Sequence, residues 1–449
     1  MNKKNFYIAV VLFLVSASIW FLVKKFESHA PVVIQNQKIE FLNKKRTLDF
    51  RVEDLETGLR SITVIIVQNK FQKEIYTEEF KGNILLGKGD TNYTDVRIDF
   101  DPVEMKLKEG SLALIIKVND YSWRNRFTGN VTVFKQVFTI DSTPPGLTCL
   151  STQHYINQGG TGLVVYQTTD DSVKNGVYVG DIFFSGFPVA ASTSKNVYIA
   201  YFAIPYNKKE PRIELLSQDK AGNESRAGFY YSIRKKAFRR DSITISDKFL
   251  QRKMPQFFSF DETLPGKPLI ECFLKINNQL RQENNQKILE ICRHSAPEAL
   301  WEGRFLRLPN AKTSALFADQ RAYFYKGKKI DQQVHLGIDL ASIAHAQVPA
   351  SNNGVVVFAG ELGIYGRTVI IDHGQNIFSM YSHLSTFNIT QDQKINKGDI
   401  IGTSGDSGLA GGDHLHFAML VGEAFVNPIE WWDKHWINDN IILKLNLIK

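Results

Sequence analysis

Glycines recur every few residues between positions 354 and 412 and divide this stretch into short apolar runs. The runs are rich in β-branched and aromatic side chains, and they comprise Val355–Phe358, Thr368–Ile371, Ile377–Tyr381, Ile400–Ile401 and Leu415–Leu420. Apolar runs of this length between turn-forming glycines favour strands over helices. We therefore expect a compact antiparallel β-domain over residues 317–435.

Histidines gather in the same part of the chain. Six of the ten histidines lie at positions 335, 345, 373, 383, 414 and 416, whereas an even distribution along 449 residues would place fewer than two there. Histidine is the commonest metal ligand and the usual proton carrier near neutral pH. The clustering therefore indicates a functional site within the expected β-domain.

The spacing of these histidines suits a metal. His414 and His416 flank Leu415, and on a strand they would point to the same face. His335 and Asp339 add an imidazole and a carboxylate, and Gly337 between them argues against a helix and allows a close approach. Zinc accepts two imidazoles and one carboxylate, leaves a fourth position for water, and lowers the pKa of that water.

Such a centre also needs proton carriers and a charge stabiliser beside the metal. His414, two residues before His416 on the same expected strand, is one candidate for this role. His383, within the segment Tyr381–Leu384, is the second.

Several motifs in this order resemble the lysostaphin/LytM-type zinc metallopeptidases over roughly residues 317–432. They are His335-x-Gly337-x-Asp339, Gly354-Val-Val, Tyr381-Ser-His383-Leu-Ser, Lys397-Gly-Asp-Ile-Ile-Gly402, Gly412-Asp-His414-Leu-His416-Phe417 and Asn427-Pro428. The resemblance implies one zinc ion per chain, bound by His335, Asp339 and His416. It also implies that His383 and His414 orient water and stabilise the oxyanion, and that the substrate is a peptide bond of peptidoglycan.

A few residues depart from this pattern or lie outside it. Ala418 stands where many relatives have an acidic residue, and Ser407 where threonine is common. Neither is a ligand, so these differences concern substrate preference and packing. We expect His373 to be structural, and Arg321 and Tyr365 either to line a cleft or to lie on the surface.

Two further β-rich stretches precede the connector and the expected β-domain. Residues 30–143 and 144–234 each contain β-branched runs and a strand that ends in aspartate before a polar loop, and the segment Asp141–Pro145 separates the two stretches. We expect two immunoglobulin-like sandwiches that act as spacers or bind other cell-envelope proteins. The fold class is thus mainly β and multidomain.

Residues 235–316 have a different sequence pattern, and we interpret them as a helical connector. Leu269–Leu280 and Lys287–Cys292 carry apolar residues at helical spacing. The segment between Lys235 and Gln333 directly precedes His335 and could cover the cleft, which would make the enzyme autoinhibited. Cys272 and Cys292 could form a disulfide or remain buried thiols. Residues 436–449 form a C-terminal extension.

The N-terminus predicts export. Phe6–Val23 is an uncharged run of 18 residues, flanked by lysines, in a segment 1–29 that we read as a short cytoplasmic tip and a signal anchor. Pro31 would follow directly after a cleavage site at Ala30, which favours an uncleaved anchor over a removed signal peptide. A single helix would then hold the protein in the cytoplasmic (inner) membrane with the remainder outside the cytoplasm. The net charge of +8 comes with no long basic run and no nucleic-acid motif, so we do not expect nucleic-acid binding.

Together these features predict a membrane-anchored zinc metalloendopeptidase that hydrolyses the peptide cross-links of peptidoglycan. The alternative is a non-catalytic wall-binding protein that activates a separate amidase. In a third hypothesis the immunoglobulin-like region carries the main function.

Overall fold

The computed structural model describes residues 3–35, 39–189 and 195–448. These residues form two compact units, which we describe separately. The first unit comprises residues 1–144 and 220–223, and the second comprises residues 145–219 and 224–449. The second unit thus contains the second β-rich stretch, the connector and the region of the clustered histidines.

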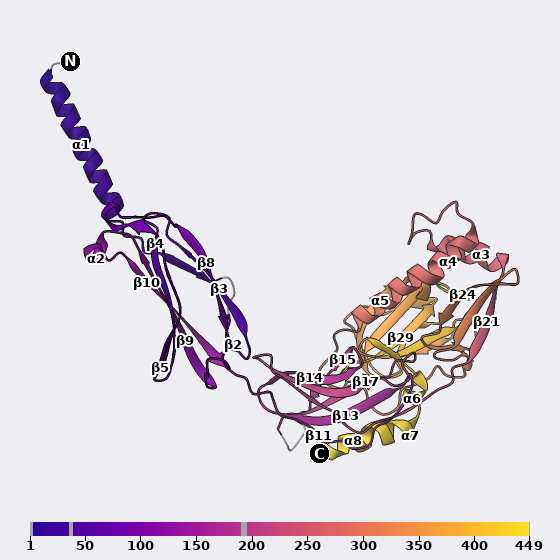
Figure 1. Cartoon of the computed structure of the whole chain (residues 1–449). Coiled ribbons are helices and arrows are strands. Elements are labelled where there is room, and N and C mark those ends of the chain that lie inside the picture. Colours follow the sequence, from indigo (N-terminus) through magenta and orange to yellow (C-terminus); the bar gives the residue numbers. More distant parts are fainter. Residues whose placement is uncertain (1–2, 36–38, 190–194, 449) are drawn as a thin grey trace. The chain divides into compact units, whose positions relative to one another are not determined.

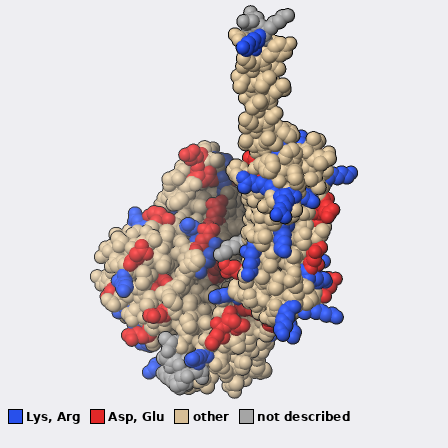
Figure 2. Space-filling model, turned by 90° about the vertical axis from the view of Figure 1, so that its left-hand side faces the viewer, with Lys and Arg blue, Asp and Glu red and all other residues tan. Residues whose placement is uncertain are grey.

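The first unit begins with helix α1 (Lys3–Lys25). Its segment Lys4–Lys25 is long and apolar enough to cross a membrane, with a mean hydropathy of 2.5, and none of it is buried. Figure 1 shows α1 as a single helix, and Figure 2 shows its surface as almost free of charged side chains between its ends.

Two sheets follow α1 and enclose a core of their own. A three-stranded sheet has the order β1 (Val32–Gln35), β3 (Arg46–Glu53), β8 (Tyr93–Phe100), and a five-stranded sheet has the order β2 (Phe41–Leu42), β10 (Val131–Ile140), β9 (Gly110–Asp120), β4 (Leu59–Gln68), β5 (Phe71–Glu79). Along β8 and β9 buried residues largely alternate with more exposed ones, and the buried set includes Val96, Ile98, Leu114 and Ile116. The expectation that residues 30–143 are rich in strands is confirmed.

The second unit starts with two four-stranded sheets and a small parallel pair (Figure 1). The sheets have the orders β11 (Leu147–Cys149), β13 (Thr161–Thr168), β17 (Val197–Ala203), β16 (Phe187–Pro188), and β15 (Ile182–Ser185), β14 (Ser172–Val179), β18 (Ile213–Asp219), β19 (Glu224–Ala227). The pair joins β12 (Tyr155–Asn157) and β20 (Ser232–Arg234). Their apolar residues belong to the same continuous core as those of the C-terminal sheet.

The connector combines helices with one strand. It contains β21 (Arg240–Ile245), α3 (Asp247–Lys253), a 3-10 turn (Met254–Phe257), α4 (Leu269–Lys275), a π-helical turn (Ile276–Leu280) and α5 (Arg281–Ile291). The predicted helices are confirmed. Strand β21 was not predicted, and it pairs in parallel with β23 (Gln320–Tyr325), which in turn pairs with β24 (Lys328–Val334).

The C-terminal sheet holds the expected strands. Its order is β22 (Lys312–Ala315), β25 (Ile338–Ala341), β33 (Leu415–Val421), β29 (Ile377–Leu384), β28 (Arg367–Asp372), β27 (Gly354–Glu361), β31 (Lys394–Ile395), with β34 (Ala424–Val426) on β33. A small sheet joins β26 (Gln347–Pro349), β32 (Ile400–Thr403) and β30 (Thr386–Phe387). Short helices end the chain: α6 (Pro428–Trp432), α7 (Lys434–Ile437) and α8 (Leu443–Leu445).

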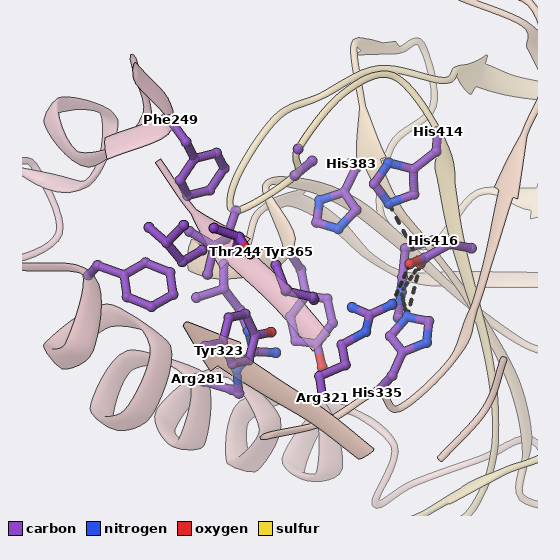
Figure 3. Close-up of a pocket in the computed structure, with 18 of the residues that line it drawn as sticks. Thr244, Phe249, Arg281, Arg321, Tyr323, His335, Tyr365, His383, His414 and His416 are labelled. Atoms are coloured by element: carbon purple, nitrogen blue, oxygen red, sulfur yellow. Dashed lines mark hydrogen bonds and ion pairs between the residues drawn. The ribbon is translucent and has the colours of Figure 1, made fainter. Parts of the chain in front are cut away.

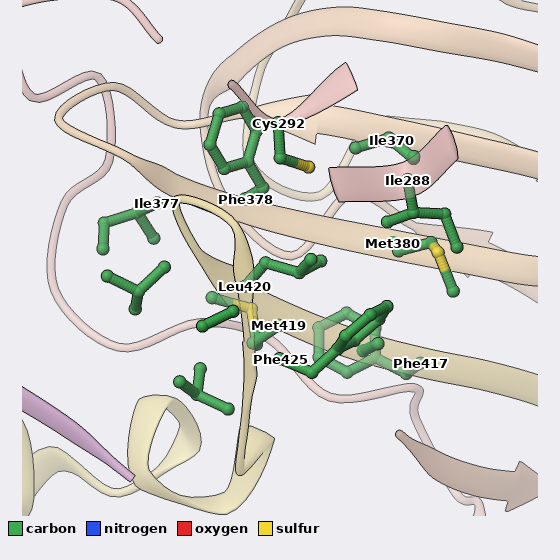
Figure 4. Packing of buried hydrophobic residues seen from close by; sticks show 14 of the residues in the cluster. Ile288, Cys292, Ile370, Ile377, Phe378, Met380, Phe417, Met419, Leu420 and Phe425 are labelled. Atoms are coloured by element: carbon green, nitrogen blue, oxygen red, sulfur yellow. The ribbon is translucent and has the colours of Figure 1, made fainter. Parts of the chain in front are cut away.

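Helix α5 packs on one face of this sheet. Figure 4 shows Ile288 beside Ile370 and Met380, and Cys292 beside Phe378. Cys272 and Cys292 are both fully buried, and all three cysteines of the chain are free thiols. Of the two alternatives for this cysteine pair, the structure shows buried thiols.

Candidate metal centre and active site

Three neighbouring strands position the predicted site residues. Asp339 of β25 lies opposite His416 of β33, and His416 lies opposite Ser382 of β29. His383 directly follows Ser382, and His335 directly follows the end of β24. Residues that are far apart in sequence are therefore brought together by the register of adjacent strands.

The three expected metal ligands converge on one point. His335 Nε2 and His416 Nδ1 each lie 2.9 Å from Asp339 Oδ1, and the two nitrogens are 3.0 Å apart. All three side chains are buried. Burial opposes ionisation of Asp339, but the neighbouring histidines hold the pKa of this carboxyl well below its usual value.

The chemistry of this donor set fits a cation. His335 Nδ1 donates to the carbonyl of Leu316 at 2.9 Å, so the Nε2 of a neutral His335 carries a lone pair. This lone pair faces the carboxylate oxygen of Asp339, an arrangement that is repulsive unless a positive charge lies between them. Burial lowers the pKa of His416 to about 4, so this ring is neutral near pH 7. Two neutral imidazoles and a carboxylate are the donors that zinc prefers.

Gly337 permits this convergence. A Cβ atom at this position would lie 2.6 Å from both Cε1 and Nε2 of His416 and 2.7 Å from the carbonyl oxygen of Phe417. Any side chain here would therefore displace the His416 ring. The expectation that this glycine allows a close approach is confirmed.

His383 and His414 lie beside the three ligand residues. Their ring centroids are 4.9 Å apart, and the His383 centroid is 5.8 Å from that of His416. His383 Nδ1 donates to the carbonyl of Ser407 at 2.8 Å, and His414 Nδ1 donates to that of Gly412 at 2.8 Å. In both rings the backbone thus holds the proton at Nδ1, and Nε2 is left for other partners.

The two rings differ in their affinity for a proton. Burial, together with the nearby His414 and His416, lowers the pKa of His383 well below its usual value. Burial acts in the same direction on His414, but Asp339, whose Oδ1 lies 3.6 Å from His414 Nε2, raises the pKa of His414 overall. The environments of the two rings thus shift their pKa values in opposite directions.

All five residues line a cavity of about 600 Å³. Figure 3 shows the histidines on one side of this cavity and Phe249 and Thr244 of the connector on the other. Arg281 of α5 and Tyr323 of β23 complete the lining on the connector side. The connector therefore forms one wall of the site.

The sequence left open whether Arg321 and Tyr365 line a cleft or lie on the surface. In the structure both residues line the cavity. Arg321 Nη2 donates to Asp339 Oδ2 at 2.8 Å. The Tyr365 ring lies 5.5 Å from that of His416, and its hydroxyl donates to Asn285 Oδ1 at 2.8 Å. Sequence reasoning missed the places of Phe249 and Arg281 in the cavity lining, because neither residue belongs to one of the metal-site motifs.

The remaining histidines of the cluster lie outside the lining of the cavity. His373 is buried, donates from Nδ1 to the carbonyl of Asn353 and accepts at Nε2 from Ser379, as expected for a structural histidine. The His345 side chain is 69% exposed and lies 3.6 Å from Asp413.

Comparison with known proteins agrees with this geometry. Residues 333–428 match Peptidase family M23. The chain belongs to this family. The M23 region is 37% identical over 97 residues to the DD-carboxypeptidase/endopeptidase Mpg of Neisseria gonorrhoeae, and this match covers 22% of each chain. It is 35% identical over 96 residues to the peptidoglycan DD-endopeptidase ShyA of Vibrio cholerae, covering 21% of this chain and 22% of that protein.

A further relative of the M23 region is a lipoprotein, NlpD of Yersinia enterocolitica, which is 33% identical over 94 residues. That match covers 21% of this chain and 96% of the NlpD sequence. By contrast, the chain spans only about a fifth of the length of Mpg and ShyA. The sequence matches to Mpg, ShyA and NlpD thus each span fewer than 100 residues of this chain.

Proposed function

We propose that this protein is a zinc metalloendopeptidase, anchored in the cytoplasmic membrane by α1, that hydrolyses peptide cross-links of peptidoglycan outside the cytoplasm. The observation that carries the proposal is the convergence of His335 Nε2, Asp339 Oδ1 and His416 Nδ1 within 3.0 Å of one another in a buried site. His416 Nε2 has no hydrogen-bond partner within the described part of the chain. Only Nδ1 of this ring therefore interacts with Asp339 and His335.

His335, Asp339 and His416 would hold one zinc ion. When bound there, zinc polarises a substrate carbonyl and lowers the pKa of a water molecule. His383 presents the lone pair of Nε2 to the cavity and would accept the proton from the attacking water. His414 would hold a proton at Nε2 and donate a hydrogen bond to the oxygen on which negative charge develops.

Two features support peptidoglycan as the substrate. The M23 region resembles Mpg and ShyA, whose names describe DD-endopeptidases. In addition, α1 is long and apolar enough to cross a membrane, which suits a protein that acts on the cell wall. The two β-rich stretches would separate the membrane from the M23 region and could bind other proteins of the cell envelope.

The test compares zinc content with cleavage of purified cell wall. Wild-type protein should contain one zinc ion per chain and release soluble muropeptides, which mass spectrometry identifies. His416→Ala and Asp339→Asn should lose both properties, whereas His345→Ala, which removes a neighbouring exposed histidine, should retain both. A wild-type protein that is fully loaded with zinc but releases no fragments from any wall type would overturn the proposal.

The alternative of a non-catalytic activator makes a different prediction. Such a protein would be folded and stable without metal, and it would increase wall cleavage only when a separate amidase is added. The complete set of two imidazoles, one carboxylate and two further histidines favours the peptidase.

A further inference from the structure

Three carboxylates meet at the start of the first unit, in a part of the chain that the peptidase does not use. Glu27 lies two residues after α1, Asp54 directly follows β3, and Asp120 ends β9. One oxygen from each of these carboxylates lies within 4.8 Å of one oxygen from each of the other two. The three residues are only 5%, 6% and 0% exposed.

Only neutral groups donate hydrogen bonds to this cluster. Asp54 Oδ1 accepts from three successive backbone amides, those of Glu56, Thr57 and Gly58 at 2.9–3.3 Å, and Glu27 Oε1 accepts from the hydroxyl of Thr57. Asp120 accepts from the amides of Ser122 and Asn130 and from the side chain of Asn130.

Two basic residues that flank Glu27 in the sequence have other partners. Lys25 Nζ donates to the carbonyl of Gly87, and His29 lies 3.3 Å from the carboxylate of Glu56. Among the ion pairs of residues 3–35, 39–189 and 195–448, none includes Glu27, Asp54 or Asp120. The protein therefore buries three acidic groups together without a balancing cation of its own.

Two of the carboxylate oxygens, Glu27 Oε2 and Asp54 Oδ2, are buried and accept no hydrogen bond from any residue that the structure describes. Burying charged oxygens without compensation is costly. Burial, together with a hydrogen bond shared with the neighbouring Glu56 carboxyl, raises the pKa of Glu27 to about 8. Burial also raises the pKa of Asp120.

We propose that Glu27, Asp54 and Asp120 form a calcium site. The cluster offers only oxygen ligands, and a hard cation prefers such ligands to the imidazole and thiolate groups that attract transition metals. Calcium also tolerates the irregular arrangement of carboxylates that different loops supply, whereas magnesium demands near-octahedral geometry and keeps most of its water.

The site would join three separate segments. Glu27 belongs to the segment that leaves α1, Asp54 to the loop between β3 and β4, and Asp120 to the end of β9. Calcium bound between them would fix the exit of the apolar helix against the end of the first sandwich. Without calcium the three carboxyl groups could not all ionise side by side at little cost, and this junction would loosen.

The experiment uses the full-length, zinc-loaded protein in detergent micelles, dialysed against calcium-free buffer to remove weakly bound calcium. CaCl₂ is then titrated while binding is followed by calorimetry and stability by thermal unfolding. We expect saturable binding of one calcium ion with a Kd of about 10⁻⁴–10⁻³ M, as in extracellular calcium modules. The unfolding temperature of the first unit should rise as calcium saturates the site.

Two variants and two controls test the assignment. Asp54→Asn and Glu27→Gln should each weaken calcium binding at least about tenfold, since affinity depends on the number of charged ligands. Asp54→Asn keeps the Oδ1 acceptor for the three amides and should fold. Glu104→Gln changes an exposed carboxylate of the first unit that lies outside the cluster, and it should bind calcium as the wild type does. His416→Ala should also bind calcium normally, so the result does not depend on the peptidase.

The absence of saturable calcium binding to the wild type would overturn the proposal. An unchanged calcium affinity in both Asp54→Asn and Glu27→Gln would also overturn it. An equal response to MgCl₂ at the same concentrations would overturn the choice of calcium.

Discussion

Arg321 Nη2 donates to Asp339 Oδ2 across 2.8 Å, while Oδ1 of the same carboxylate faces His335 and His416. The guanidinium thus orients the carboxylate without occupying the oxygen that would bind metal. We expect Arg321→Met to reduce zinc affinity about 10–100-fold, the range seen when a residue that orients a ligand is lost. Competition with a chromogenic chelator measures this affinity. Unchanged affinity in Arg321→Met would show that the ion pair does not position Asp339.

Gly337 provides a second test of the centre. The added methyl group of Gly337→Ala would meet the His416 ring at 2.6 Å. We expect this variant to fold but to bind zinc weakly, because the ring must move away from Asp339. Zinc content and far-UV circular dichroism measured together would distinguish this outcome from unfolding. Gly411→Ala is a suitable control, because a Cβ atom at Gly411 would meet nothing within 4 Å.

His383 and His414 should affect the rate and leave metal binding intact. We expect His383→Gln to lower kcat about 10²–10⁴-fold through loss of a proton acceptor. His414→Gln should lower it about 10²–10³-fold through loss of a charge-stabilising donor. Both variants should retain zinc, and a loss of zinc in either would mean that the residue is a ligand.

Because the connector forms one wall of the cavity, a substitution in this wall should change the cleavage of large and small substrates by different amounts. Phe249 lines the cavity opposite the histidines, and Arg252 Nη2 donates to the carbonyl of Gly411 at 2.7 Å, which ties α3 to the loop before His414. If the connector limits access, Phe249→Ala should increase cleavage of intact wall severalfold and change cleavage of a short cross-linked peptide little.

Two comparisons make this test specific. Phe260→Ala removes another partly exposed connector phenylalanine that does not line the cavity, and it should leave both rates unchanged. An equal loss of activity of Phe249→Ala on both substrates would indicate instead that Phe249 binds substrate.

Glu430 predicts a pH dependence of stability in the second unit. It accepts hydrogen bonds from Asn157 Nδ2 at 2.7 Å and from the amide of Thr161 at 2.8 Å, and burial raises its pKa from 4.5 to about 7. The folded state therefore binds a proton more tightly than the unfolded state. Stability should fall as pH rises from 4.5 to 7, by up to about 3 kcal/mol.

Urea unfolding at several pH values measures this dependence. Glu430→Gln cannot titrate at this position, so its free energy of unfolding should change less between pH 5 and 8 than that of the wild type. Glu298→Gln, at an exposed position, should retain the wild-type slope. Identical slopes for Glu430→Gln and the wild type would exclude Glu430 as the source.

The sequence predicted the features that depend on local pattern. The apolar runs Val355–Phe358 and Thr368–Ile371 lie within a few residues of turn-forming glycines, so the local sequence predicts strands there. The structure contains these strands as β27 and β28. The structure also brings His335, Asp339 and His416 together, as their motifs implied. That the two β-rich stretches are immunoglobulin-like stays a prediction.

Features that depend on distant contacts could not be predicted in the same way. Strand β21 finds its partner in β23, 80 residues later, and neither strand alone indicates the pairing. The ion pair between Arg321 and Asp339 depends on how the strands are arranged in the folded chain, and no local sequence pattern encodes that arrangement. The continuous core that joins residues 145–219 to the M23 region is likewise a property of the folded chain.

The register of β25, β33 and β29 has a consequence for how the site assembles. Because Asp339 lies opposite His416 and His416 opposite Ser382, a slip of β33 by one residue would turn His416 to the other face of the sheet. Backbone hydrogen bonds between these strands thus set the positions of Asp339 and His416, two of the residues that would hold the metal. Metal binding would then require little loss of conformational entropy, and misregistered chains would be unable to retain the ion.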